Sequence, residues 1–186
     1  MRRSRTAGPK KPTKAELLAA FGRRLPDVIA PRLKALFVGI NPGLYSGAVG
    51  HHFARSGNRF WPALHRARFT DRLLAPSEER ELLKYGYGIT NIVDFATAAA
   101  DELKPDALRA GGRRLITKIR RYRPRVVAIL GLKAFQIAFG QPGAGFGLQE
   151  VRIGSSEVWV LPNPSGLNAH YQLPALVRMF RKVRQH

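Results

Sequence analysis

Short apolar runs recur along the chain, and the segments between them carry apolar residues at helical spacing. Four runs predict strands, at residues 35–40, 88–93, 125–131 and 158–162. Each run is continuous rather than alternating, which is typical of strands covered on both faces in a mostly parallel sheet. The segment VRIGSSEVWVL predicts a hairpin that turns at residues 154–156 and could add an antiparallel edge.

The segments between the strands, and the one after the last strand, predict helices. These helices are expected at residues 58–69, 77–85, 105–122, 132–139 and 173–183. Ahead of the first strand, Thr13 and Glu16 fit a capping box for a helix through about Arg24. This alternation predicts a three-layer α/β/α sandwich around a central, mostly parallel four-stranded sheet, formed by one domain at residues 13–186.

The ends of the chain and its length change this picture little. A chain of 186 residues with 45% hydrophobic content can fill one ordinary core. Residues 1–12 are charged, contain Pro9 and Pro12 and have no apolar period, so we expect a disordered basic tail. No run approaches the roughly 18 apolar residues that a membrane span needs, and none follows Arg2 and Arg3 as export would demand. We expect a cytoplasmic protein that associates with the nucleoid and not with a membrane.

The high net positive charge of the chain indicates a negatively charged binding partner. The formal net charge is +20 and the sequence pI is about 11.5, and such a field concentrates polyanions at the surface. The basic excess continues beyond the tail, at residues 113–125 and 177–184. Nucleic acid is therefore the natural partner, although charges on the long helix and the final helix are most often solvated.

The sequence offers little for metal binding or covalent catalysis. There is no cysteine, which excludes thiolate metal sites and a cysteine nucleophile. His51 and His52 are adjacent and would point to opposite sides of an extended segment, so we predict no metal and no cofactor. Neither a G-x-G-x-x-G nor a P-loop pattern occurs, and no nucleophile elbow is present.

Polar residues gather where the predicted strands end. In open α/β sheets ligands bind outside the carboxyl ends of the strands, and that rule puts Asn41, Asp94 and Asn163 on one rim. A neutral amide and a carboxylate on a basic body suit chemistry on a base flipped out of DNA. An amide can orient water but is too weak a base to take its proton, so we hypothesise that Asp94 contributes to water activation.

Several motifs together resemble one family. They are GINPG (39–43), HHFARSGNRFW (51–61), GITNIVD (88–94), AGGRRLITKI (110–119) and LPNPSGLN (161–168). In order and spacing they resemble the mismatch-specific uracil-DNA glycosylases, the bacterial relatives of thymine-DNA glycosylase, from about Leu33 to Arg181. The resemblance implies the uracil-DNA glycosylase fold and hydrolysis of the bond between base and sugar.

The resemblance also implies roles for individual residues. Asn41 would orient the attacking water and Phe53 would stack on the extruded base. Main-chain groups around Ile40 and Phe53 would contact the pyrimidine edge, and Asn163 stands where stricter uracil glycosylases carry a histidine. Gly43 replaces a tyrosine of those enzymes that blocks a 5-methyl group, which implies tolerance for pyrimidines enlarged at position 5.

A wedge loop is implied as well. Gly166 and Leu167 match the segment that enters the duplex, with Leu167 filling the vacated space. The segment reads GLNAH rather than the usual Gly-Leu-Ser-Arg, so Asn168 and Ala169 alter the contact with the opposite guanine. The expected activity is that of a monofunctional, monomeric glycosylase without an obligate protein partner. It would act in base excision repair on double-stranded DNA containing G:U or a damaged pyrimidine.

Other interpretations remain open at this point. Asn41 could be a turn residue, Asp94 a cap, and Phe60 and Trp61 core aromatics. The chain could be a non-catalytic DNA- or RNA-binding domain, which would account for the charge but not for Asn41 beside Asp94. It could also be a small nucleotide-binding enzyme, which would account for the sheet but not for the charge.

Overall fold

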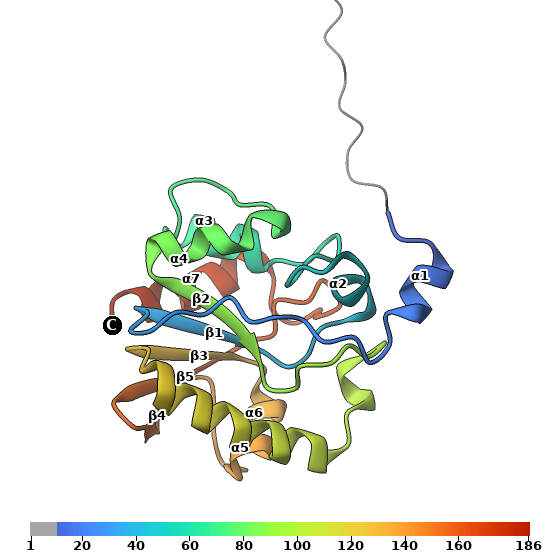
Figure 1. Ribbon diagram of the computed structural model, residues 1–186. Helices are drawn as coiled ribbons and strands as arrows, with labels where there is room; N and C mark the ends of the chain where they lie inside the picture. Colours follow the sequence, from blue (N-terminus) through green and yellow to red (C-terminus); the bar gives the residue numbers. More distant parts are fainter. Residues whose placement is uncertain (1–10) are drawn as a thin grey trace, which may run out of the picture.

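The computed structural model describes residues 11–186, so the predicted basic tail at residues 1–12 lies outside the described residues except for its last two. Strands and helices alternate along the chain (Figure 1). The strands are β1 (Ala35–Gly39), β2 (Tyr87–Asn91), β3 (Val126–Leu130), β4 (Gly147–Ile153) and β5 (Ser156–Leu161). The helices are α1 (Lys14–Ala19), α2 (Leu44–Val49), α3 (Phe60–Arg66), α4 (Leu82–Tyr85), α5 (Pro105–Tyr122), α6 (Leu132–Phe139) and α7 (Leu173–Arg184), with 3-10 turns η1 (Pro76–Glu81) and η2 (Ala100–Glu102).

The strands form one sheet in the order β2-β1-β3-β5-β4. The first four of these run parallel, and β4 pairs antiparallel with β5 at the edge. The predicted mostly parallel sheet is confirmed, and the hairpin makes it five-stranded rather than four-stranded. Because the four parallel strands point the same way, the segments after β1, β2, β3 and β5 all leave from one edge of the sheet.

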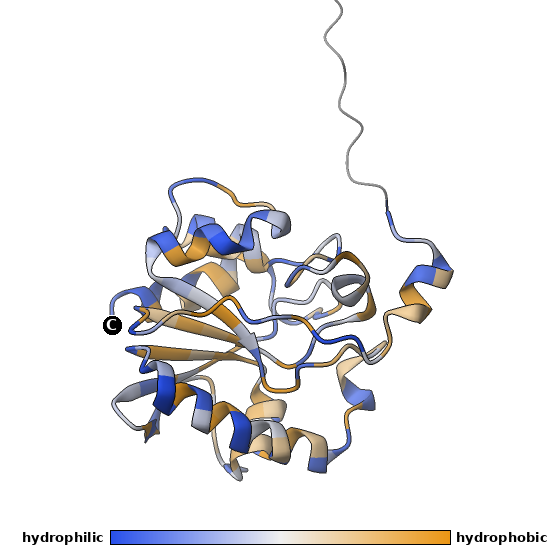
Figure 2. Cartoon of the chain, viewed as in Figure 1, coloured by the Kyte–Doolittle hydropathy of each residue, from blue (hydrophilic) through white to orange (hydrophobic). Residues whose placement is uncertain are grey.

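Helices cover both faces of the sheet and enclose two cores. On one face, side chains of α3, α4 and α7 pack around the buried rings of Phe37, Phe60 and Phe180. On the other face, α5 and α6 pack around Leu115 and Phe135. Figure 2 shows mostly hydrophobic strands between helices such as α4 and α5, in which hydrophilic and hydrophobic residues alternate. The three-layer α/β/α sandwich is therefore confirmed.

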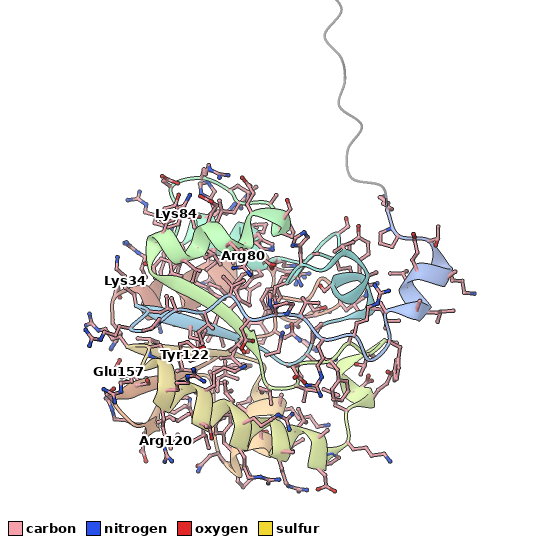
Figure 3. The ribbon with its side chains drawn as sticks, viewed as in Figure 1. Lys34, Arg80, Lys84, Arg120, Tyr122 and Glu157 are labelled. Atoms are coloured by element: carbon pink, nitrogen blue, oxygen red, sulfur yellow. The ribbon has the colours of Figure 1, made fainter. Side chains whose placement is uncertain are left out.

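Charged side chains occupy the outer surfaces of these layers. Lys84 projects from α4 on one side of the sheet and Arg120 from α5 on the other (Figure 3).

No helix in residues 11–186 is long and apolar enough to cross a membrane.

The helix ends differ from the predicted ones where tertiary contacts intervene. The capping box of Thr13 and Glu16 is present, but α1 ends at Ala19 instead of near Arg24. The chain turns at Gly22, which has φ +75° and donates its N–H to the carbonyl of Ala96. Residues 77–85 are divided into η1 and α4, and α2 was not predicted, because its six residues are too few to establish a period.

Candidate functional site

A cavity of about 690 Å³ lies at the carboxyl edge of the sheet, and we call it the rim cavity. Its walls come from the segment after β1, the loop at residues 51–58, residues 97–101 and the loop at residues 163–168. Five asparagines line it, including Asn41, Asn91 and Asn163. The position agrees with the rule for open α/β sheets.

The amide of Asn41 is held in one orientation. Its Nδ2 donates to the hydroxyl of Thr97 at 2.7 Å and to the carbonyl of Pro42 at 3.0 Å. The Thr97 hydroxyl itself donates to the carbonyl of Ala99 at 2.7 Å, so toward Asn41 it can only accept. Because these neighbours are all acceptors, the NH₂ group must face them. The Oδ1 atom accepts no hydrogen bond from any residue between 11 and 186.

A second fixed amide, Asn91, ends β2 and lies beside Gly39 of β1. Its Nδ2 is 3.3 Å from Nδ1 of His52, whose Nε2 lies 3.0 Å from the carbonyl of Pro26. That carbonyl can only accept, so Nε2 carries the proton and Nδ1 accepts from Asn91. Burial lowers the pKa of His52, which keeps the ring neutral. The Oδ1 of Asn91 is thus left free for a ligand donor.

Space beside Asn91 depends on a glycine. A Cβ atom on Gly39 would collide with Oδ1 of Asn91 and would lie 3.2 Å from the ring of Phe53. Sequence reasoning missed Asn91 because the predicted strand ran to residue 93, and it considered His52 only as a metal ligand. A strand boundary at Asn91 would have identified the residue.

Asn163 offers a hydrogen-bond donor to the rim cavity, whereas Asn41 and Asn91 offer acceptors. Its Oδ1 accepts from the N–H of Ser165 at 2.9 Å, so its NH₂ group remains available as a donor. Asn168 is occupied within the same loop: Nδ2 donates to the carbonyl of Asn163 at 2.9 Å and Oδ1 accepts from the N–H of His170 at 3.1 Å. Asn168 therefore shapes the loop from within. Leu167 at its tip is 74% exposed, so it does not tuck inward.

Phe53 lines the rim cavity with its ring stacked on Phe60 at a centroid distance of 4.0 Å. Phe60 and Trp61 are buried, which confirms that they are core aromatics. Phe53 has φ +53°, a left-handed conformation that is uncommon for a bulky side chain and is found mostly where the surroundings enforce it. One such restraint is the carboxylate of Glu79, which accepts the N–H of His52 at 2.7 Å.

Arg59 connects this aromatic loop to the loop at residues 163–171. Its guanidinium donates to four carbonyl groups of that loop, those of Ser165, Gly166, Asn168 and Tyr171, at 2.9–3.3 Å. Its main-chain N–H donates to the carbonyl of Pro164 at 2.9 Å. Gly166 lies so close that a Cβ there would be 2.7 Å from the carbonyl oxygen of Gly57. We call this set of contacts the Arg59 clamp, which sequence reasoning did not foresee.

Ile40 and Gly43 both line the rim cavity, as expected. The Ile40 carbonyl accepts the N–H of Val93 at 2.9 Å, so that group is not open to a ligand. Gly43 has empty space around it: a Cβ there would meet nothing within 4 Å. The missing side chain therefore leaves room in this wall.

The side chain of Asp94 does not reach the cavity that Asn41 lines. Asp94 lies three residues beyond the end of β2, and its Oδ2 is 3.2 Å from Nη1 of Arg24. It does not line the rim cavity. After Asn91 the chain continues beside the segment after β1, where the Ile40 carbonyl accepts the N–H of Val93, and it also contacts the N-terminal segment, where the Asp94 carbonyl accepts the N–H of Leu25. Asp94 therefore lies at the same edge of the sheet as Asn41, but its side chain pairs with Arg24 instead of facing the rim cavity. This geometry gives no support to a role of Asp94 in water activation.

The rim cavity is lined mainly by uncharged groups. Among its described lining residues Asp101 is the one carboxylate and Arg55 the one strongly basic group, and both are exposed. Such a lining suits a neutral, flat molecule with alternating donors and acceptors better than it suits a nucleotide phosphate.

Comparison with known proteins agrees with this geometry. The model of the uracil DNA glycosylase superfamily matches residues 26–185. The chain belongs to the uracil-DNA glycosylase superfamily. This membership supports a DNA glycosylase role, that of a hydrolase acting on DNA. The match covers every element that lines the rim cavity except α1.

A solved structure with a similar fold is the solution NMR structure of a candidate uracil DNA glycosylase from Methanosarcina acetivorans. It has a TM-score of 0.56 and 18% sequence identity, over 88% of this chain and 99% of that chain. At this identity the similarity shows the fold alone, and it agrees with the α/β architecture described above.

Proposed function

We propose that the protein is a monofunctional DNA glycosylase that flips uracil, preferably opposite guanine, out of duplex DNA and hydrolyses its bond to deoxyribose in base excision repair. The observation that carries the proposal is the fixed amide of Asn41, whose Oδ1 remains free to accept a hydrogen bond from water. Its substrate would keep the protein with the chromosomal DNA of the cytoplasm. Mismatch preference rests on the sequence resemblance and on the exposed Leu167.

Recognition of the base follows from the orientation of the amides. Uracil and thymine carry an N3–H between two carbonyl oxygens, and Oδ1 of Asn91 accepts this proton while Nδ2 of Asn163 donates to a carbonyl. Cytosine has no proton on N3, so its lone pair would face another acceptor and lose the hydrogen bond. Stacking on the ring of Phe53 adds roughly 1–3 kcal/mol. These contacts favour uracil over the normal cytosine.

Bond cleavage requires no covalent enzyme intermediate. The bond from C1′ to N1 breaks with its electron pair leaving on the base, and the sugar develops oxocarbenium character. Asn163 donates a hydrogen bond to the departing anion, which is the kind of electrostatic support that lowers such barriers. A water held by Oδ1 of Asn41 then adds to C1′ and releases its proton to solvent. An oxocarbenium-like carbon is electrophilic enough that an orienting amide can serve without a carboxylate base.

Purified protein incubated with duplexes containing G:U, A:U, G:T or G:C tests this proposal. Alkali cleaves the strand at the abasic site, and we expect cleavage with G:U, weaker cleavage with G:T and none with G:C. An intact G:U strand at stoichiometric protein would overturn the proposal and favour a non-catalytic nucleic-acid-binding domain.

The free space at Gly43 makes a specificity prediction. Gly43→Tyr is expected to raise the preference for uracil over thymine by about 10- to 200-fold, the range for one methyl group in a tight pocket. The backbone has φ −75°, which any residue adopts, so folding should be unaffected. Single-turnover release from G:U and G:T duplexes measures the ratio, with Gly43→Ala as the small control. A ratio that stays constant would show that this wall does not face the 5-methyl group.

The position of Asp94 makes a second prediction. Asp94→Asn removes the ion pair with Arg24, whose guanidinium is largely exposed, and such pairs contribute about 0–1 kcal/mol. We therefore expect an unchanged single-turnover rate of uracil release. A loss comparable with that of an Asn41 variant would restore Asp94 to the reaction.

A further inference from the structure

A second cavity, of about 990 Å³, lies away from the rim between α3 and α7. Its lining includes Arg66 and Arg68 at the end of α3, and Arg178 and Arg181 on the outer side of α7. We call it the α3–α7 groove. It shares no lining residue with the rim cavity, and both helices lie on the same face of the sheet (Figure 1).

The charge of the α3–α7 groove is not balanced by the protein. Its four guanidinium groups form no ion pair with any of residues 11–186, although nearby Arg72 is paired with Glu78 at 2.8 Å. The one carboxylate of the lining, Asp71, accepts a hydrogen bond from the hydroxyl of Tyr85. A concave surface with several uncompensated guanidinium groups attracts anions, and the planar donor fork matches phosphate oxygens.

The backbone at Arg68 adds an independent observation. After α3 the N–H of Arg68 donates to the carbonyl of His65 and the N–H of Phe69 to that of Leu64, which is a Schellman motif. Arg68 occupies its left-handed position with φ +65°, where glycine is favoured because a side chain is strained. The chain thus carries an arginine, aimed into the groove, at a position that glycine would stabilise. Such a strained residue is a reason to look for a function of its side chain.

We propose that the α3–α7 groove binds phosphate groups of a nucleic acid, at a place separate from the rim cavity. Arg178 and Arg181, which a sequence pattern assigns to a solvated helix face, then belong to a binding surface. The occupant is the flank of the duplex engaged at the rim, because Pro174 of the groove lining lies just after the loop at residues 163–171, which carries Leu167 at the rim cavity. The inference does not require base excision to occur.

Arg68→Gly tests the proposal, with Arg123→Gly as a matched control. Arg123 also has a left-handed backbone, with φ +49° at the end of α5, and does not line the groove. Both variants lose one positive charge and one strained side chain, so the melting temperature of each should be unchanged or higher. Binding to an undamaged 30-base-pair duplex is measured by fluorescence anisotropy over a range of salt. For Arg68→Gly we expect a log-log salt slope shallower by about 0.9, the value for one lost phosphate contact, and for Arg123→Gly an unchanged slope.

Equal slopes for the two variants, or a lower melting temperature for Arg68→Gly alone, would overturn the proposal. Weakened binding to an acidic peptide with unchanged binding to DNA would also overturn it, because the partner would then be a protein. A duplex of 10 base pairs is too short to leave a flank in the groove, so the difference between Arg68→Gly and the wild type should disappear with it. A difference that persists would place the contact on a separate segment of DNA and overturn the assignment to the flank. Uracil release from a short G:U duplex under enzyme excess should stay at the wild-type level in Arg68→Gly, and its absence in the wild type would count against the proposed function alone.

Discussion

Replacing Asn41 with alanine is expected to lower the single-turnover rate of uracil release by about 10²- to 10³-fold, the scale for losing one oriented polar group at the reacting centre. In the proposed mechanism, the variant loses the acceptor that orients the attacking water just after β1. Affinity for undamaged duplex should change little, because phosphate contacts provide most of it and Asn41 is uncharged. The measurement is base release under enzyme excess, read as alkali-labile strand breaks.

Two comparisons separate a chemical role of Asn41 from a structural one. The Asn41 amide also donates to Pro42 and Thr97, so the melting temperature must be compared with that of the wild type. Asp94→Asn is the matched control, since it alters a polar side chain on the neighbouring segment outside the rim cavity. If the Asn41 variant released uracil at the wild-type rate, the residue would revert to a turn role.

The second large effect is expected from the Arg59 clamp. Arg59→Ala removes a guanidinium that donates to four carbonyl groups of the loop carrying Leu167. A hydrogen bond from a charged donor contributes about 1.5–3 kcal/mol to stability. The Arg59 bonds are partly exposed, so each contributes less than a buried one. If the loop conformation that acts on the substrate loses the free energy of one such hydrogen bond, the rate falls by about 10- to 100-fold. We expect a decrease of that size for uracil release from duplex DNA.

The substrate provides the control for this prediction. A wedge acts by keeping an extruded base out of the duplex, so it should matter little when the uracil is already unpaired. Arg59→Ala should therefore keep most of its activity on single-stranded uracil DNA. Arg113→Ala, on the exposed outer face of α5, matches the change in charge and should affect neither substrate. An equal loss on single-stranded and duplex substrates would mean that Arg59 supports the rim cavity in general.

Several features could be predicted because they depend on local pattern. The continuous apolar runs identified the parallel strands, since a strand buried on both faces must be apolar throughout. The bounds of α5 and α6 agreed with the predicted residues 105–122 and 132–139, because each has a clear apolar period between a strand and a turn. The Asn-Pro segments after β1 and β5 were correctly placed at the rim cavity for the same reason.

The same local reasoning placed Asp94 at the correct edge of the sheet but could not give the direction of its side chain. The ion pair with Arg24, which belongs to the N-terminal segment, decided that direction. Thr97 could not be identified either, because its hydroxyl acts on Asn41 across 56 positions of the chain.

By itself, the sequence determined the layers of the fold, the edge of the sheet at which the rim cavity lies and the high positive charge. These follow from which residues are apolar and how many are charged, and both are properties of the chain before it folds. The tertiary structure alone decided which polar atoms of Asn41, Asn91 and Asn163 remain free, how Arg59 holds its loop and where four arginines meet in the α3–α7 groove. The physical reason is that hydrogen bonds are directional and saturable: the atom of an amide that stays available depends on partners that only the folded chain brings within reach.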